Sequence, residues 1–108
     1  MPKVRGLLAV WMVAMLASGC VFVQPTEGGK KVRVLTAGEV ERCRSLGTLT
    51  SQVADSVAAV PRSREAVADD VLLNAKNAAA AQEADTIVPA SEMKNGRQTF
   101  NIYRCLLP

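Results

Sequence analysis

The pattern of hydrophobic and polar positions changes three times along the chain, and each change predicts a different element. Residues 6–23 carry no charged side chain, residues 31–35 alternate charged with β-branched side chains, and residues 63–83 repeat apolar side chains at three-and-four spacing. Alternation is typical of a strand with one buried face, whereas three-and-four spacing is typical of a helix with an apolar stripe. We therefore expect an α+β domain behind an apolar leader.

Several segments have the composition of β-strands. Val32 and Val34 should point inward from the first of them, and a turn around Ala37-Gly38 should follow it. Asn95-Gly96 is the strongest hairpin dipeptide of the chain and should lead into the last strand. The predicted strands are residues 31–35, 46–53, a segment opened by 85–88, and 98–105.

One long helix is predicted from about Ser63 to Glu83. Ser63 can cap its first turn, and acidic residues that include Asp69 and Asp70 lie near the positive end of the helix dipole. Because the second half of the apolar stripe is mostly alanine, the helix can lie close to its partner. The stripe consists of Val67, Val71, Leu72, Ala75, Ala78 and Ala79. The expected fold is a small antiparallel or mixed sheet of three to four strands with this helix packed on it.

The last strand poses a problem, because strict alternation places Phe100 and Ile102 on one face and Tyr103 and Cys105 on the other. Both faces should be buried, yet one helix covers only one of them. A bulge near Tyr103, or a disulfide that holds the second face against residues 39–44, would resolve the conflict.

The apolar leader has the organisation of a secretion signal. Lys3 and Arg5 precede an apolar region over residues 7–17. The following Leu16-Ala17-Ser18-Gly19-Cys20 resembles the bacterial lipobox, in which a peptidase cuts before a cysteine that carries diacylglycerol. This resemblance implies a signal peptide over residues 1–19 and lipidation of Cys20.

Two other interpretations of the leader are weighed against this one. The uncharged stretch reaches the lower end of the roughly 17–25 residues that cross a bilayer, so an uncleaved anchor is an alternative. Ordinary cleavage into a soluble protein is the second. The small residues before Cys20 favour lipidation, which leaves residues 20–30 as lipidated cysteine and tether and residues 31–108 as the domain.

Charge excludes one class of function. The sequence has 13 basic and 10 acidic residues, and removal of Lys3 and Arg5 with the leader reduces the net charge from +3 to +1. Nucleic-acid binding needs basic residues clustered on one face, so no nucleic-acid partner is expected.

Two cysteines, Cys43 and Cys105, remain after Cys20. A secreted chain in an oxidising compartment favours a bridge between them. Closing a loop of about 60 residues would contribute about 4 kcal/mol in the chain-entropy model. Redox-active thiols usually lie in a Cys-X-X-Cys motif, and these two are far apart in sequence. A structural bridge is expected, with exchange-active or free thiols as the alternative.

Little in the sequence supports catalysis. There is no histidine, which removes the usual general base and the commonest metal ligand. Asp69 and Asp70 diverge around the helix axis and cannot converge on one substrate, and Gly28-Gly29 precedes a strand, so it does not form a P-loop. We expect no enzyme, no metal, no cofactor and no small-molecule substrate.

The chain resembles a family of small bacterial envelope lipoproteins of unknown function, distantly similar to the stress-sensor lipoprotein of the Rcs phosphorelay. The resemblance covers residues 31–105 and rests on four motifs. These are Cys43-Arg44-Ser45-Leu46-Gly47, the Asn- and Ala-rich helix of residues 74–81, Ala84-Asp85-Thr86-Ile87-Val88, and Tyr103-Arg104-Cys105. The sensor has four cysteines in two disulfides, whereas this chain keeps one possible pair, so a stress-sensing role is not carried over. The resemblance implies the α+β architecture and the Cys43–Cys105 bridge.

The resemblance also implies an outer-membrane address, which agrees with Val21 after the lipidated cysteine. An inner-membrane anchor is the alternative, and the domain should face the periplasm. The expected function is non-catalytic: Cys20 anchors the protein in membrane lipid, and the domain binds an envelope protein or peptidoglycan partner. The alternative function is a thiol-redox or chaperone-like factor that uses Cys43 and Cys105.

Overall fold

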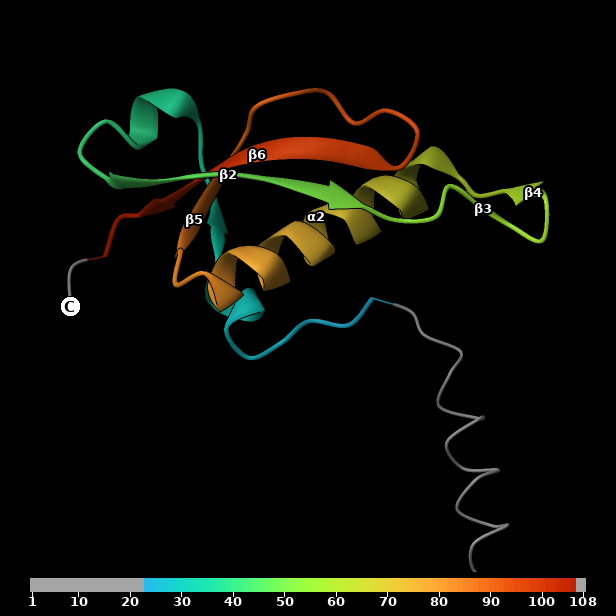
Figure 1. Cartoon of the computed structure of the whole chain (residues 1–108), viewed down its shortest axis with the longest axis horizontal. Coiled ribbons are helices and arrows are strands. Elements are labelled where there is room, and N and C mark those ends of the chain that lie inside the picture. Colours follow the sequence, from blue (N-terminus) through green and yellow to red (C-terminus); the bar gives the residue numbers. More distant parts are fainter. Residues whose placement is uncertain (1–22, 107–108) are drawn as a thin grey trace, which may run out of the picture.

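The computed structural model describes residues 23–106 and has one long helix packed on a four-stranded sheet (Figure 1). The sheet order is β1-β5-β6-β2, with β1 parallel to β5 and the other pairs antiparallel. A separate two-stranded hairpin pairs β3 with β4. The strands are β1 (Arg33–Val34), β2 (Arg44–Gln52), β3 (Ser56–Val57), β4 (Val60–Pro61), β5 (Thr86–Pro89) and β6 (Arg97–Arg104). The predicted α+β fold with a mixed sheet is confirmed.

The helix α2 (Arg64–Ala81) begins where the sequence predicts. The Ser63 side chain caps it by accepting a hydrogen bond of 3.1 Å from the Ala66 backbone N–H. Such a cap satisfies one of the free N–H groups of the first turn. Two short 3-10 helices, η1 (Gly29–Lys31) and η2 (Ala37–Glu39), lie on either side of β1 in sequence.

The helix η2 stands where a simple turn is expected. Thr36 and Glu39 form a capping box, because the Thr36 backbone N–H and hydroxyl both donate to the Glu39 carboxylate. These hydrogen bonds, from the backbone first and the side chain second, lower the pKa of Glu39. The Thr-X-X-Glu spacing is visible in the sequence and could have predicted this element.

The main core lies between α2 and the sheet. Phe100, Ile87 and Ile102 are fully buried, and Val71, Ala75 and Ala79 meet them from the helix. The alanines allow the close approach that the sequence predicts. Ser51 is the polar exception on this side: its hydroxyl donates to the Val71 carbonyl at 2.7 Å and accepts from the Asn74 side chain at 3.0 Å. A buried hydroxyl paired in this way costs little.

The expectation for the first strand is half right. Val32 is 5% exposed and belongs to the core, but Val34 is 41% exposed and does not point into it. The reason is its position. β1 is only two residues long and forms the edge of the sheet, whereas α2 packs mainly over β2, β5 and β6.

Of the two predicted devices, the disulfide resolves the conflict in the last strand, whereas the bulge that is present does not alter the alternation of β6. The register shifts between Ser45 and Gly47, so the bulge lies in β2, opposite Ile102 and Tyr103, and not in the last strand itself. The η2 segment lies on the side of the sheet away from α2 (Figure 1), and the disulfide ties its end to β6. Phe100 and Ile102 therefore face the helix, while Tyr103 is only partly buried.

Candidate functional site

The segment at the start of the described residues is bound to helix α2. The side-chain carbonyl of Asn77 accepts hydrogen bonds from the Thr26 backbone N–H at 3.0 Å and the Thr26 hydroxyl at 3.3 Å. The Asn77 amide donates to the Gln24 carbonyl at 2.7 Å. One helical asparagine thus holds three groups of this segment, so the stretch expected to be a tether is docked from Gln24 onwards.

Two glycines let this segment approach closely. Gly29 is buried, and a β-carbon there would overlap the Asn77 side chain; at Gly28 it would lie 3.0 Å from the Ala80 β-carbon. Their place in the sequence suggests a linker, but their role here is packing. Glycine composition alone cannot distinguish the two, because both need a residue without a side chain.

The described residues begin at Val23, three residues after the predicted lipidation site. Cys20 lies outside the described residues, so its modification stays a prediction. Chain geometry nevertheless limits its position: three residues span at most about 11 Å. A membrane anchor at Cys20 would therefore bring Val23 within that distance of the bilayer surface.

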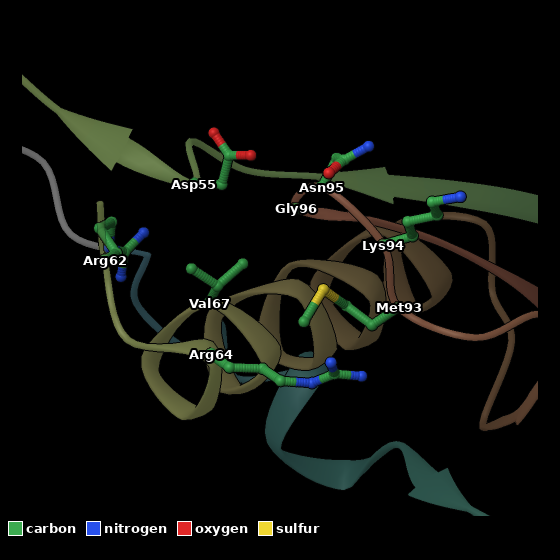
Figure 2. A pocket seen from close by; sticks show the side chains of 8 residues that line it. All are labelled: Asp55, Arg62, Arg64, Val67, Met93, Lys94, Asn95 and Gly96. Carbon is green, nitrogen blue, oxygen red and sulfur yellow. The ribbon is translucent and has the colours of Figure 1, made fainter. Parts of the chain in front are cut away.

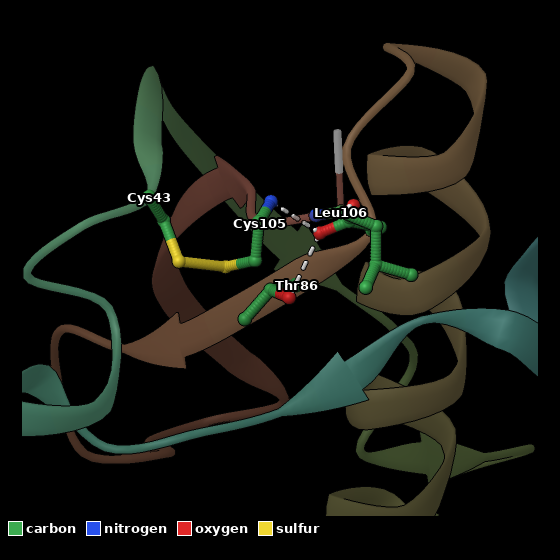
Figure 3. The surroundings of a disulfide bond; sticks show 5 residues. Cys43, Thr86, Cys105 and Leu106 are labelled. Carbon is green, nitrogen blue, oxygen red and sulfur yellow. Dashed lines mark hydrogen bonds between the residues drawn. A yellow bond between two sulfur atoms is a disulfide. The ribbon is translucent and has the colours of Figure 1, made fainter. Parts of the chain in front are cut away.

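The two predicted disulfide cysteines are bonded to each other (Figure 3). Their Cα atoms are 4.4 Å apart, and they are separated by 62 positions in sequence. The bridge joins the end of the η2 segment to the residue that follows β6. The Cys43–Cys105 prediction is confirmed.

A carboxylate fastens the chain around Cys105. Asp85 accepts hydrogen bonds of 2.8 Å from the backbone N–H groups of Cys105 and Leu106, and one of 2.9 Å from the Thr86 hydroxyl (Figure 3). Burial alone would raise the pKa of Asp85, but these hydrogen bonds, helped by the positive charge of Arg33, lower it below its ordinary value. The carboxylate is therefore ionised over the whole neutral range.

A cleft of about 370 Å³ opens at the start of α2 (Figure 2). Val67 and Met93 form its apolar floor, and both pack against the core. Charged side chains stand around them. The lining comes from the segment between β2 and β3, the residues around the start of α2 and the turn before β6. It consists of Asp55, Arg62, Arg64, Val67, Met93, Lys94, Asn95 and Gly96.

One cation at this cleft is already engaged. The Arg62 guanidinium donates to the Ala54 carbonyl at 2.9 Å and to the Asp70 carboxylate at 2.6 Å. Asp70, which is expected to compensate the helix dipole, pairs with Arg62. Arg64 and Lys94 are exposed, and no ion pair joins either of them to a carboxylate within the described part of the chain.

A second cavity, of about 340 Å³, lies at the β2 edge next to the docked segment. Val23, Val53 and Val57 supply its apolar surface. It brings the first described residue of the chain beside the β3–β4 hairpin, which lies more than 30 positions away in sequence. Its lining is Val23, Gln52, Val53, Ala54, Val57, Arg62, Asp70 and Asn74.

Residues 23–106 contain no group of three metal-ligating side chains, and no helix among them is long and apolar enough to cross a membrane.

The site residues predicted from the sequence fall into two sets. Cys43 and Cys105 are brought together, whereas Cys20 is outside the described range. Sequence reasoning missed Asn77 and the two clefts, because each depends on residues far apart along the chain.

Comparison with known proteins gives a family without a described function. No curated protein and no solved structure matches the chain, so similarity to the Rcs sensor stays a resemblance of sequence pattern. The profile of DUF4156, a domain of unknown function, matches residues 23–105. This match begins at the docked segment and ends at the second disulfide cysteine, and the chain belongs to the DUF4156 family.

Proposed function

We propose that this protein is a non-catalytic lipoprotein of the bacterial envelope, anchored through acyl chains on Cys20, whose domain binds an envelope partner close to the membrane. The observation that carries the proposal is the docking of residues 24–29 by Asn77, directly after a leader that ends in a lipobox-like motif. A long free tether would let the domain reach far from the bilayer. Docking leaves only the few residues between Cys20 and Gln24 to separate the domain from the anchor.

The cleft at the start of α2 is the surface that we assign to the partner. An apolar floor surrounded by charges of both signs suits a protein segment better than a glycan strand, because protein surfaces combine apolar anchors with charged rims. Arg64 and Lys94 favour an acidic group on the partner. An outer-membrane location with the domain in the periplasm is part of the proposal.

The thiol-redox alternative has less support. Redox-active cysteines usually lie close together in a Cys-X-X-Cys motif, whereas Cys43 and Cys105 are separated by 62 positions in sequence. The bridge also joins two segments that would otherwise be held by few apolar contacts, which suits a structural role.

Lipidation is tested by labelling cells with radioactive palmitate and by measuring the mass of the purified protein. The wild-type chain should incorporate label and show the mass of a chain that starts at Cys20 with its acyl groups. Cys20→Ala should incorporate none. An unmodified wild-type mass would contradict the anchor.

Partner binding is tested by photo-crosslinking in intact cells. A crosslinking residue in place of Arg64, at the cleft, should capture a discrete partner, whereas one in place of Glu41, on the η2 side, should not. Sedimentation with purified peptidoglycan distinguishes the two partner classes. Capture of the same products from both positions would contradict the assignment of the cleft.

A further inference from the structure

The β3–β4 hairpin carries an apolar tip that projects from the domain beyond the start of α2 (Figure 1). Val57 and Val60 are 62% and 65% exposed, and residues 56–61 include no charged side chain. Most exposed apolar residues need no explanation when they occur singly. Here four consecutive apolar residues, Val57-Ala58-Ala59-Val60, form the end of a projecting element.

The turn at this tip is unfavourable for the residues that form it. Ala58 and Ala59 have φ angles of 50° and 65°, and Val57 pairs with Val60, which defines a two-residue turn with both central residues in the left-handed region. The same chain uses Asn95-Gly96 for the equivalent turn between Lys94 and Arg97. Alanine is strained in this conformation, so the hairpin keeps an apolar tip where a polar turn would be more stable.

The position of the tip relative to the N-terminus indicates what covers it. Val57 and Val23 line the same cavity, and Val23 is three residues from Cys20. These residues can span at most about 11 Å. An acyl-anchored Cys20 therefore places this side of the domain at the bilayer surface, and the hairpin is an exposed apolar element on that side.

We propose that residues 57–60 insert into the bilayer interface and fix the orientation of the domain on the membrane. This inference rests on the proposed Cys20 anchor. The acyl chains supply the association, so the tip needs only a weak interaction of its own, which acts at the high effective concentration that the short connection provides. The exposed Arg64, close behind the hairpin, can meet anionic headgroups.

This orientation places the hairpin tip and the cleft on the same side of the domain, the side that faces the membrane. With the tip in the interface, the cleft lined by Arg64 and Lys94 lies near the membrane. The η2 segment, on the opposite side of the sheet from α2, points away from it (Figure 1). A protein that binds the cleft would then do so at the bilayer surface, through a membrane-proximal segment of its own.

Tryptophan fluorescence tests the insertion directly. The only tryptophan of the sequence is Trp11 in the leader, so a single introduced tryptophan reports alone in the mature lipidated protein. Val60→Trp places it at the tip. The matched control is Gly38→Trp in η2, where an added β-carbon meets nothing within 4 Å. Both proteins are reconstituted in vesicles of phosphatidylethanolamine and phosphatidylglycerol that include a lipid brominated on its acyl chains.

We expect the tip tryptophan to emit at shorter wavelength and to be quenched at least about twofold more than the control, because interfacial elements bury their apolar side about 5–10 Å deep. Val57→Asp in the Val60→Trp protein should reduce quenching to the control level. Equal quenching of the two reporters in protein that sediments with the vesicles would overturn the insertion and leave a protein as the occupant of the tip. Protein that stays in the supernatant with an unmodified mass would instead overturn the Cys20 anchor, and the insertion with it.

Discussion

The two faces of the sheet are held by different kinds of interaction. On the α2 side, a continuous apolar cluster includes Phe100, Ile87 and Ile102, all fully buried. On the η2 side, Val40 and Val88 are buried but stand outside that cluster. There the Cys43–Cys105 disulfide and the hydrogen bonds of Asp85 hold the chain.

This difference follows from size. A domain of fewer than 100 residues with one helix can cover one face of a sheet with apolar packing, and its surface-to-volume ratio leaves little for the second. A covalent bond and a few charge-assisted hydrogen bonds need less buried area than a second apolar layer. The η2 side should therefore respond to redox state and pH, and the α2 side to changes of side-chain volume.

The largest expected effect is loss of the disulfide. Cys43→Ser, and Cys105→Ser as its match, should lower the free energy of unfolding by about 4 kcal/mol, because a loop of this length is no longer closed in the unfolded chain. Thermal melts followed by circular dichroism measure it. If activity were lost while the melting temperature held, the thiol-redox alternative would replace the structural role.

Volume changes should break the α2 side. Ala75 is fully buried where the helix approaches the sheet, and Ala75→Leu should cost about 1–3 kcal/mol by overpacking. Ala81→Leu, at the exposed end of the same helix, is the control and should cost little. Urea unfolding of both variants gives the comparison. Equal losses would show that close helix approach does not limit this face.

The Asp85 carboxylate should make the η2 side sensitive to acid. Asp85→Asn replaces the oxygen that accepts from the Leu106 N–H with an amide group, and should cost about 1–2 kcal/mol at neutral pH. Because the folded pKa is lowered, this stabilisation is complete above about pH 4 and is lost as the pH falls through the folded value. Melts of wild type and variant should therefore converge at low pH. A constant difference down to pH 2 would contradict this role.

The smallest expected effect concerns the hairpin tip, which belongs to neither face. Ala58→Asn with Ala59→Gly should stabilise the protein by about 1 kcal/mol, because these residues accept positive φ angles. The reverse exchange at the existing turn, Asn95→Ala with Gly96→Ala, should destabilise the protein. Urea midpoints of the two double variants test the pair. If both double variants shifted the urea midpoint in the same direction, strain at positive φ angles would not explain the difference between the two turns.

Much of the fold could be predicted because the relevant patterns are local. The three-and-four spacing and Ser63 define α2, and Asn95-Gly96 defines a turn. The bridge could be predicted because only two cysteines follow Cys20. The position of the bulge could not be predicted. An extra residue can lie in either of two paired strands, and the sequence does not show whether β2 or β6 carries it. The exposure of Val34 depends on where the helix lies across the sheet.

The sequence by itself determined the long helix, the main strands, the disulfide partners and the scarcity of catalytic groups, since these depend on spacing and composition over short stretches. Only the tertiary structure decided that Asn77 binds the N-terminal segment, that Gly29 packs where a linker was expected, and that Val23 and Val57 line one cavity. Each of these joins residues far apart along the chain. The physical reason is that a side-chain amide, a glycine or an exposed valine has no distinctive local pattern, and its role depends on the surface that folding places next to it.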